Sequence, residues 1–358
     1  MKAAVARAFR APLVIEDIAL RPPGPGEVEV RIKAVAICHS DILFIDGAWG
    51  GDLPAVFGHE AAGEVVAVGE GAEFAVGDRV VVTLIRGCGE CVCCASDNRT
   101  YCRSEFPLSR STPLTDGAGA AVRQGAATGA FAERVTVHGS QLAKVGEQIG
   151  WAEASLLACG VITGYGAVTN AAKLPAGATA VIVGAGGVGL NAVQGAALSG
   201  ASRVIVVDIS EEKLEIAREF GATDCLDARQ PNLARTIRGL TGGGADYVFV
   251  TVGNTKAMDG AYSMIAPGGS VVLVGMAASG EMSTFDPLLL ADMGQKIIGS
   301  KMGQSAPARD IPPLERAFLD GRLKLSELVT GRFAFEDINE AIATTRAGKG
   351  VRNVVIME

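Results

Sequence analysis

Residues 179–208 constrain the fold most strongly. They begin with Thr179 and the apolar run Ala180-Val-Ile-Val183, which is typical of a strand buried on both faces of a parallel sheet. The sequence Gly184-Ala-Gly186-Gly187-Val188-Gly189 follows and opens an Ala- and Leu-rich stretch that suits a helix. A second apolar run, Val204–Val207, ends in Asp208. This order predicts a β-α-β unit of about thirty residues around a G-x-G-x-x-G turn.

Such a turn indicates a dinucleotide site, because its glycines let backbone amides approach a pyrophosphate at a helix N-terminus. The pattern alone is a weak signal in a chain with 47 glycines. The strand, the helix and the acid together favour the site over a chance Gly-rich turn. Asp208 can accept hydrogen bonds from the adenosine ribose. It would repel a 2′-phosphate, and Ile209 offers no cation, so NAD is predicted rather than NADP.

The length of 358 residues suggests two domains. An apolar content of 49% and a charged content of 20% indicate a compact soluble protein. The net charge of −7 argues against nucleic acid or an anionic membrane as partner. The first residues, Met1–Arg7, contain no apolar signal region, and no run approaches the length of a membrane span. A cytoplasmic location is therefore expected, where thiols stay reduced.

Residues 1 to about 150 are predicted as strands and turns. Glu27–Ala36 alternates polar and apolar residues, and Glu64–Val68 and Arg79–Val82 are further β-branched runs. These runs predict an antiparallel, barrel-like domain. Residues 103–130 are rich in Gly, Ala, Ser and Thr and are predicted to form a long loop. A helix that carries Cys159 is expected from Glu153 to about Asn170, joining the two domains.

Beyond the β-α-β unit the pattern predicts a doubly wound sheet. Ser210 and Gly221 bracket a predicted helix over 211–220. Strand-like runs recur at Tyr247–Val252, Ser270–Gly275 and Lys296–Ser300, with helices between them. After residue 301 helices are expected at Pro313–Leu319 and Ala334–Arg346. A last strand, Val351–Met357, is expected to return to the first domain.

Five of the eight cysteines lie between Cys88 and Cys102. Cys88, Cys91, Cys94 and Cys102 have the short spacing that allows four thiolates to bind one tetrahedral zinc, which is structural chemistry with no position left for substrate. Cys93 is expected to be a bystander. The alternatives are a group of free thiols in a loop or an iron–sulfur cluster.

Four further residues, Cys38, His59, Glu60 and Cys159, are candidate ligands of a second metal. Sequence spacing alone cannot bring them together. Taken singly, Cys159 is more often a core thiol, and His59 is as often a structural histidine.

Taken together, these residues resemble the zinc-containing, medium-chain alcohol dehydrogenase family. The resemblance spans the chain, and its motifs occur in the family's order. They are Cys38-His-Ser-Asp41, Gly58-His59-Glu60-x₂-Gly63-x₅-Gly69, the four cysteines 88, 91, 94 and 102, Cys159-Gly-Val-Ile-Thr163-Gly-Tyr-Gly166, the glycine-rich turn with Asp208, and Gly350-Val-Arg352.

The resemblance implies an α/β fold of two domains. Residues 1–160 and 302–358 would form a GroES-like, β-barrel-type catalytic domain with a structural zinc lobe at 86–103. Residues 161–301 would form a Rossmann domain with a doubly wound parallel sheet that binds NAD. The implied cofactors are two zinc ions per chain and NAD, and the implied assembly is a homodimer or homotetramer.

The resemblance also implies the catalytic roles. Cys38, His59 and Cys159 would hold the catalytic zinc, a site type known from alcohol dehydrogenase, and Glu60 would be a nearby acid that can ligate transiently. Asp41 would orient His59. Ser40 would hydrogen-bond the substrate oxygen and begin the proton path. Zinc would lower the pKa of the alcohol, and hydride would pass to the nicotinamide.

Further residues are implied to bind the cofactor. Thr163 and Val188 would position the nicotinamide, with Val274 and Gly275 on its carboxamide side. The remaining contacts would be His39 and Arg352 on the pyrophosphate, the turn glycines Gly184, Gly186, Gly187 and Gly189, and Lys213 beside Asp208 on the ribose. Lys213 fits a solvated helix lysine equally well.

Three positions depart from the family or define the pocket. Leu43 stands where many members carry a histidine that ends a proton relay, so the relay beyond Ser40 is unassigned. Trp49 stands where members that process glutathione adducts carry an acid, which argues against such a substrate. Trp49 and Leu84 would line the pocket and favour an apolar, including an aromatic, alcohol; ordinary packing is the alternative for both.

Three functions remain open at this point. The first is oxidation of a primary or aromatic alcohol, or reduction of its aldehyde, with NAD. The second keeps the fold but oxidises a polyol, an amino alcohol or another secondary alcohol. The third is a zinc-stabilised protein that binds a dinucleotide without turnover, for which Cys38, His59 and Cys159 together would have little use.

Overall fold

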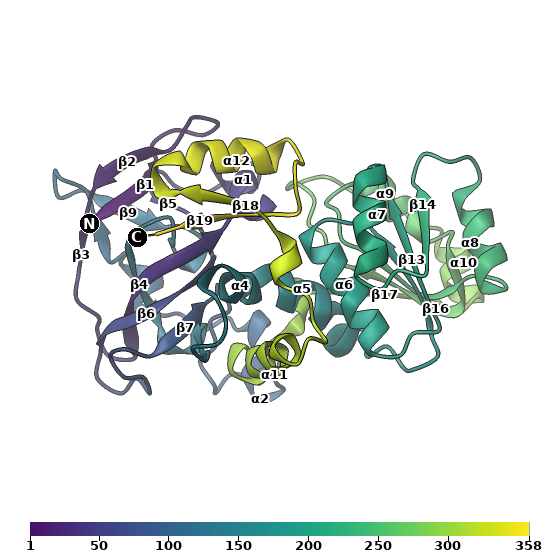
Figure 1. Ribbon diagram of the computed structural model, residues 1–358, viewed down its shortest axis with the longest axis horizontal. Coiled ribbons are helices and arrows are strands. Elements are labelled where there is room, and N and C mark those ends of the chain that lie inside the picture. The colour runs from purple at the N-terminus through teal and green to yellow at the C-terminus, as the bar shows by residue number, and fades with distance from the viewer. Residues whose placement is uncertain (358) are drawn as a thin grey trace. The chain divides into compact units, whose positions relative to one another are not determined.

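The computed structural model describes residues 1–357, which form two compact units (Figure 1). The first unit combines Met1–Cys159 with the chain from Ala306 onward, and the second unit is Gly160–Ser305. The first unit is therefore built from both ends of the chain.

Two sheets form the first unit. The larger has seven strands in the order β11-β7-β6-β4-β19-β18, with β10 also paired to β4, and the smaller has the order β2-β1-β5-β9-β8-β3. The strands are β1 (Lys2–Ala6), β2 (Val14–Asp17), β3 (Ala19–Leu20), β4 (Glu27–Ala36), β5 (Ala55–Val56), β6 (Glu60–Val68), β7 (Arg79–Val82), β8 (Leu114–Thr115), β9 (Ala121–Gln124), β10 (Arg134–His138), β11 (Leu142–Lys144), β18 (Val329–Ala334) and β19 (Arg352–Ile356).

The predicted strand at 27–36 is confirmed as β4, which lies at the centre of this unit. It pairs with β6, β10 and β19, all antiparallel. Val28, Val30 and Ile32 are buried in the main hydrophobic core, which gathers side chains from both sheets. The helices of the unit are α1 (His39–Ile45), α2 (Val92–Ala95), α3 (Pro107–Arg110), α4 (Trp151–Leu156), α11 (Pro307–Leu319) and α12 (Ile338–Arg346).

Two expectations for this unit were wrong in part. The stretch 103–130 is not one long loop, because it contains α3, β8 and β9. The helix expected from Ala334 begins only at Ile338, because the chain up to Ala334 is the strand β18, which pairs in parallel with β19. The expected return of the last strand is confirmed: β19 lies beside β4, with Val355 opposite Val35 (Figure 1).

The second unit is a six-stranded, all-parallel sheet in the order β14-β13-β12-β15-β16-β17, which confirms the predicted doubly wound fold. This strand order reverses between β12 and β15, and ligands of such sheets bind outside the carboxyl ends of the strands at that point. The strands are β12 (Thr179–Val183), β13 (Arg203–Asp208), β14 (Asp224–Asp227), β15 (Ala245–Val250), β16 (Ile265–Leu273) and β17 (Lys296–Gly299); the helices are α5 (Ile162–Gly166), α6 (Gly187–Leu198), α7 (Glu211–Glu219), α8 (Leu233–Thr241), α9 (Thr255–Ala261) and α10 (Pro287–Asp292).

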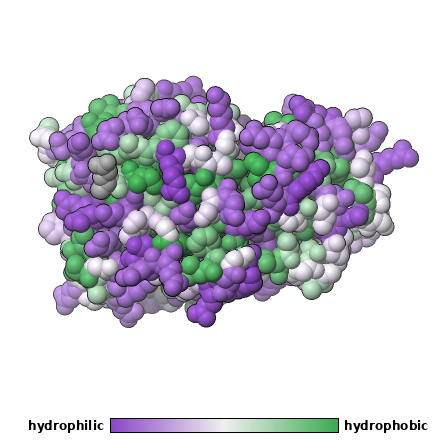
Figure 2. Space-filling model, in the orientation of Figure 1, coloured by the Kyte–Doolittle hydropathy of each residue, from purple (hydrophilic) through white to green (hydrophobic). Residues whose placement is uncertain are grey.

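Hydrophilic side chains cover most of the face shown in Figure 2, and hydrophobic residues lie scattered among them. Within residues 1–357, one helix, Trp151–Ala171, is long and apolar enough to cross a membrane by length and composition alone. Of its most apolar window, 83% is buried inside the protein. A core helix of a globular protein has this character.

Candidate functional site

Three segments of the first unit bring the four candidate ligands of the second metal together. Cys38 follows β4, while His59 and Glu60 stand at the start of β6. Ala36 faces Glu60 in the antiparallel pair of these strands, so the residues just beyond, among them Cys38 and His59, continue side by side. One potential ligand atom of each of the four residues lies within 4.8 Å of the others, and all four residues are buried.

Cys159 is brought to this group by a helix that changes locally from α-helical to π-helical geometry. The expected helix of 153–170 is observed as Trp151–Ala171, but it contains two π-helical turns, and Cys159 lies in the first, Leu157–Val161. Single π-turns inside α-helices occur often at functional sites. The apolar sequence does not distinguish a π-turn from an α-turn, so this feature was not predicted.

Asp41 contacts the segments that carry Cys38 and His59. It is fully buried, and its carboxylate accepts hydrogen bonds from the backbone N–H of Cys38 at 3.2 Å and of Gly58 at 3.0 Å. The same carboxylate lies 2.8 Å from Nδ1 of His59. Burial lowers the pKa of His59, but Asp41 and Cys38 outweigh it and raise that pKa well above its usual value.

The residues fit a zinc ion. With Nδ1 of His59 turned to Asp41, the buried Nε2 has no hydrogen-bond partner among residues 1–357, as expected for a nitrogen reserved for a metal. A hydrogen bond from Cys159 is the main cause that holds the pKa of Cys38 well below its usual value, and the pKa of Cys159 is raised by the same contact and by burial. Two thiols and one imidazole are a donor set that zinc prefers.

Glu60, a member of this group, forms a buried ion pair with Arg352. Burial raises the pKa of Glu60 to about 7, although Arg352 opposes the shift. Arg352 is the first residue of β19, and only 6% of its surface is exposed. The family resemblance implied Arg352 as a pyrophosphate contact; in the structure its guanidinium pairs with Glu60. This pair was not predicted from the sequence. It forms because β6, which begins with Glu60, and β19, which begins with Arg352, both pair with β4.

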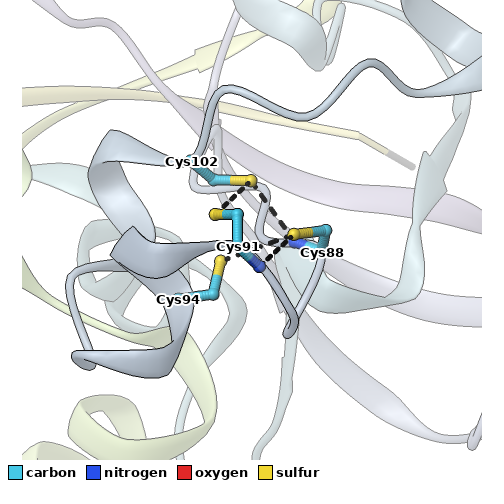
Figure 3. Close-up of side chains that lie close together, drawn as sticks. All are labelled: Cys88, Cys91, Cys94 and Cys102. Atoms are coloured by element: carbon cyan, nitrogen blue, oxygen red, sulfur yellow. Dashed lines mark hydrogen bonds between the residues drawn. The ribbon is translucent and has the colours of Figure 1, made fainter.

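The cysteines 88, 91, 94 and 102 form a second group, in which the four sulfur atoms converge (Figure 3). The Sγ atoms of Cys88 and Cys94 are 3.9 Å apart, as are those of Cys91 and Cys102. Zinc–sulfur bonds of 2.3 Å at a tetrahedral ion separate the sulfurs by about 3.8 Å. Cys93 lies outside the group, and all eight cysteines are free of disulfides.

Backbone amides support the sulfur atoms of this group. The N–H groups of Glu90 and Cys91 donate to Sγ of Cys88 at 3.4 and 3.3 Å. A hydrogen bond from Ser104 and then these amides lower the pKa of Cys88 to about 6, which favours the thiolate that a metal requires. Outside the group, Asp97 is ion-paired with Arg309 of α11, so the lobe is attached to the rest of the unit.

The glycine-rich turn lies at the carboxyl end of β12 in the second unit. Gly184 has a φ of 103°, which favours glycine. A Cβ on Gly189 would lie 1.8 Å from the carbonyl oxygen of Gly184, so α6 can pack this closely only with glycine there. Asp208 ends β13, and its carboxylate accepts hydrogen bonds from the N–H of Ala185 at 2.6 Å and of Ser210 at 2.9 Å.

The other candidate cofactor residues of the second unit lie at several places. Val188 is in the first turn of α6, and Lys213 is in the first turn of α7, where its N–H donates to Ser210. Val274 and Gly275 directly follow β16 at its carboxyl end. The hydroxyl of Thr163, in α5, lies 3.6 Å from the sulfur of Met302, a contact that was not predicted.

The remaining candidates belong to the first unit. His39 and Ser40 form the start of α1, and His39 is exposed whereas Ser40 is half-buried. The half-buried Leu43 lies in the same helix. Trp49 follows the helix, and Leu84 follows β7; both are half-buried.

Two family models match the chain. A model described as an alcohol dehydrogenase GroES-like domain matches residues 24–147. A model described as a zinc-binding dehydrogenase matches residues 187–319.

Solved structures resemble the whole chain. An alcohol dehydrogenase zinc-binding domain protein from Burkholderia ambifaria is 34% identical with a TM-score of 0.95, covering 100% of this chain and 98% of the other. Benzyl alcohol dehydrogenase from Acinetobacter calcoaceticus is 31% identical with a TM-score of 0.93, covering 100% and 99%. A zinc-binding dehydrogenase from Sinorhizobium meliloti bound to NADP shares the fold at 24% identity and a TM-score of 0.83, covering 99% and 98%.

Proposed function

Because the chain belongs to the zinc-binding medium-chain alcohol dehydrogenase family, we propose that it transfers hydride between a primary or aromatic alcohol, or its aldehyde, and NAD. The observation that carries the proposal is the buried convergence of Cys38, His59 and Cys159 beside Glu60. We assign the metal chemistry to residues 1–160 and 302–358 and the binding of NAD to residues 161–301.

We assign two zinc ions to the chain. Cys38, His59 and Cys159 would hold the catalytic ion, with Glu60 as a nearby acid, and the four cysteines of the 86–103 lobe would hold the structural ion. When bound, the catalytic ion supplies a Lewis acid that makes a substrate hydroxyl more acidic.

The chain's own residues orient the reactants and move the proton. Asp41 accepts the hydrogen bond from Nδ1 of His59 and so keeps Nε2 as the lone-pair donor. Oγ of Ser40, at the start of the same helix, would take up the proton of the substrate hydroxyl as its own O–H proton is released. Leu43 cannot take up the released proton, so water or the cofactor ribose would receive it.

The residues of the second unit would bind the dinucleotide. The amides of the Gly184–Gly189 turn would face the pyrophosphate. His39 and Arg352 stay further candidates for binding it. Thr163, Val188, Val274 and Gly275 are assigned to the nicotinamide end. Asp208, with Lys213, is assigned to the adenosine ribose, where its charge would repel a 2′-phosphate.

Replacement of Asp208 by glycine is expected to shift the ratio of kcat/KM for NAD over that for NADP about ten- to hundredfold toward NADP, because a like charge near the 2′-phosphate is removed. Steady-state kinetics with each cofactor measures the ratio. Asp208→Asn is the matched control, since it keeps an acceptor for the N–H groups of Ala185 and Ser210 but removes the charge. It should shift the ratio in the same direction. An unchanged ratio in both variants contradicts the assigned role.

The alcohol class rests on the pocket candidates. Trp49 offers an aromatic face and Leu84 an apolar one, which favours an apolar or aromatic substrate over a polyol. One relative of the whole chain is a benzyl alcohol dehydrogenase.

The test of the proposed function follows NADH absorbance with NAD and benzylic, primary aliphatic, secondary and polyol alcohols, before and after a zinc chelator. Turnover of benzylic or primary alcohols that the chelator abolishes is the expected result. Turnover that survives removal of both zinc ions contradicts the zinc assignment, and turnover of polyols alone contradicts the substrate class.

We also propose that the protein is a homodimer or homotetramer in the cytoplasm. The edge strand β17 and the segment around α10 expose large apolar side chains, which are Phe285, Leu288, Leu289, Met293 and Ile297. Exposed apolar groups of this size favour association. The eight free cysteines are consistent with a reducing compartment.

A further inference from the structure

Three aromatic side chains of the first unit, Trp49, Phe44 and Phe57, form a group that we name the ring row. Phe44 lies in its middle. Its ring meets the indole of Trp49 edge-on, with 5.0 Å between centroids, and stacks on the ring of Phe57 at 5.8 Å. Both separations lie in the range in which aromatic pairs attract each other. Phe44 also packs against the main core of the unit, so the row is anchored at its centre.

The backbone next to Trp49 is held by the end of α1. Gly47 has a φ of 73°, and its N–H donates to the carbonyl of Phe44. The N–H of Ala48 donates to the carbonyl of Leu43. These two bonds and the left-handed glycine form a Schellman motif. The backbone next to Trp49 is thus fixed, and the edge contact with Phe44 restricts the side-chain torsions of the indole.

The other end of the ring row adjoins the metal-binding segment. Phe57 precedes Gly58 and His59 in the chain, and the N–H of Gly58 donates to the carboxylate of Asp41 that also contacts His59. The ring of Phe57 is seated where Gly125 has no side chain, because a Cβ there would lie 2.3 Å from the ring. The ring of Phe57 is therefore held in place, and the ring of Phe44 stacks on it.

Resting on the function proposed above, we propose that Phe44 is a positioning residue for aromatic selectivity: it holds the indole of Trp49 in place relative to the segment that carries His59. An aromatic substrate then meets a ring that is already ordered, and binding does not have to order it. An aliphatic alcohol has no π face and gains less from the ordered indole. Phe44 should therefore affect the KM of aromatic alcohols more than kcat.

The test uses Trp151→Phe as background, because the chain has two tryptophans and this change leaves Trp49 as the only one. In that background, Phe44→Leu is expected to lower the fluorescence anisotropy of Trp49 and to raise its quenching by acrylamide. The KM for benzyl alcohol is expected to rise about two- to tenfold, the loss of one aromatic pair. Its kcat and the KM for a primary aliphatic alcohol should each change less than about twofold.

Two matched variants separate positioning from general packing. Phe44→Tyr keeps the ring and should restore both the anisotropy and the KM for benzyl alcohol. Phe9→Leu makes the same exchange at a ring that covers Gly47 of the same turn but takes no part in the ring row, and it should leave the selectivity unchanged. If Phe44→Leu does not fold, Phe44→Met, which keeps more of the apolar volume, takes its place.

Two results overturn the inference: a Trp49 signal that Phe44→Leu leaves unchanged, or an equal loss for benzylic and aliphatic alcohols. If the parent protein turns over neither alcohol class, the proposed function fails. Quenching of Trp49 by benzyl alcohol then decides the inference separately. A Kd about two- to tenfold weaker in Phe44→Leu supports it, and an equal Kd overturns it.

Discussion

Replacement of Cys159 by serine is expected to lower kcat/KM for alcohol oxidation by about a thousandfold or more. The hydroxyl of serine does not ionise near neutral pH and is a poor zinc ligand, so the buried donor set of Cys38 and His59 would lose its third member. A Lewis acid contributes several kcal/mol to the stabilisation of charge in a transition state, and each 1.4 kcal/mol is about tenfold in rate. Steady-state kinetics with NAD gives the activity, and atomic spectroscopy gives the zinc content.

The zinc content of Cys159→Ser is expected to fall from about two ions per chain to about one. Cys225→Ser is the control, because Cys225 is a half-buried thiol of the second unit that belongs to neither metal group. It should keep both ions and full activity. Full turnover in Cys159→Ser would contradict the assignment of Cys159 as a ligand of the catalytic zinc.

Replacement of Cys94 by serine is expected to cause the largest loss of stability. Cys94 is the buried member of the four-cysteine group, and a structural zinc contributes its binding free energy to folding. We expect the free energy of unfolding to fall by several kcal/mol, with one zinc lost. Thermal unfolding followed by circular dichroism, together with zinc analysis, measures both.

Cys93→Ser is the matched control for this change, because Cys93 is the neighbouring residue and lies outside the group. It should keep two zinc ions and an unfolding temperature close to that of the parent protein. Similar unfolding temperatures for Cys93→Ser and Cys94→Ser would show that the group does not bind a structural ion.

Local sequence patterns predicted the second unit well. The run 180–183 is apolar because β12 is central in a parallel sheet. In the following turn, Gly184 is favoured by its positive φ, and Gly189 is required because a side chain there would meet the carbonyl oxygen of Gly184. Ser210 caps α7 as expected, since its side chain accepts from the N–H of Lys213. Each of these features depends on residues that are close together in the sequence, so a single sequence is enough to predict it.

Features that depend on distant partners could not be predicted in this way. β18 is a strand because β19 lies beside it, and its own sequence, Val329–Ala334, includes a glycine that strands disfavour. β8 and β9 are too short to show a period of two. The helix expected from Pro313 begins earlier, at Pro307, where proline at the first helical position is favourable, and Pro312 and Pro313 lie inside it.

The ligand residues were identified through resemblance to a family, and the structure adds what holds them in place. The spacing of residues 38, 59 and 159 in the sequence predicts neither the register of β4 and β6 nor the π-turn at Cys159. The ion pair of Glu60 with Arg352 escaped notice for the same reason, because it joins residues almost three hundred positions apart.

The two-ended construction of the first unit has a consequence for biosynthesis. A ribosome that adds about 5–20 residues per second needs roughly 15–60 s to proceed from Glu60 to Arg352. During that interval β4 has no β19 beside it, and Glu60 lacks its cationic partner. The second unit, Gly160–Ser305, is contiguous and can close as soon as it has emerged. We therefore expect the second unit to fold first in the nascent chain. The surroundings of the catalytic metal site are completed last, when Arg352 pairs with Glu60.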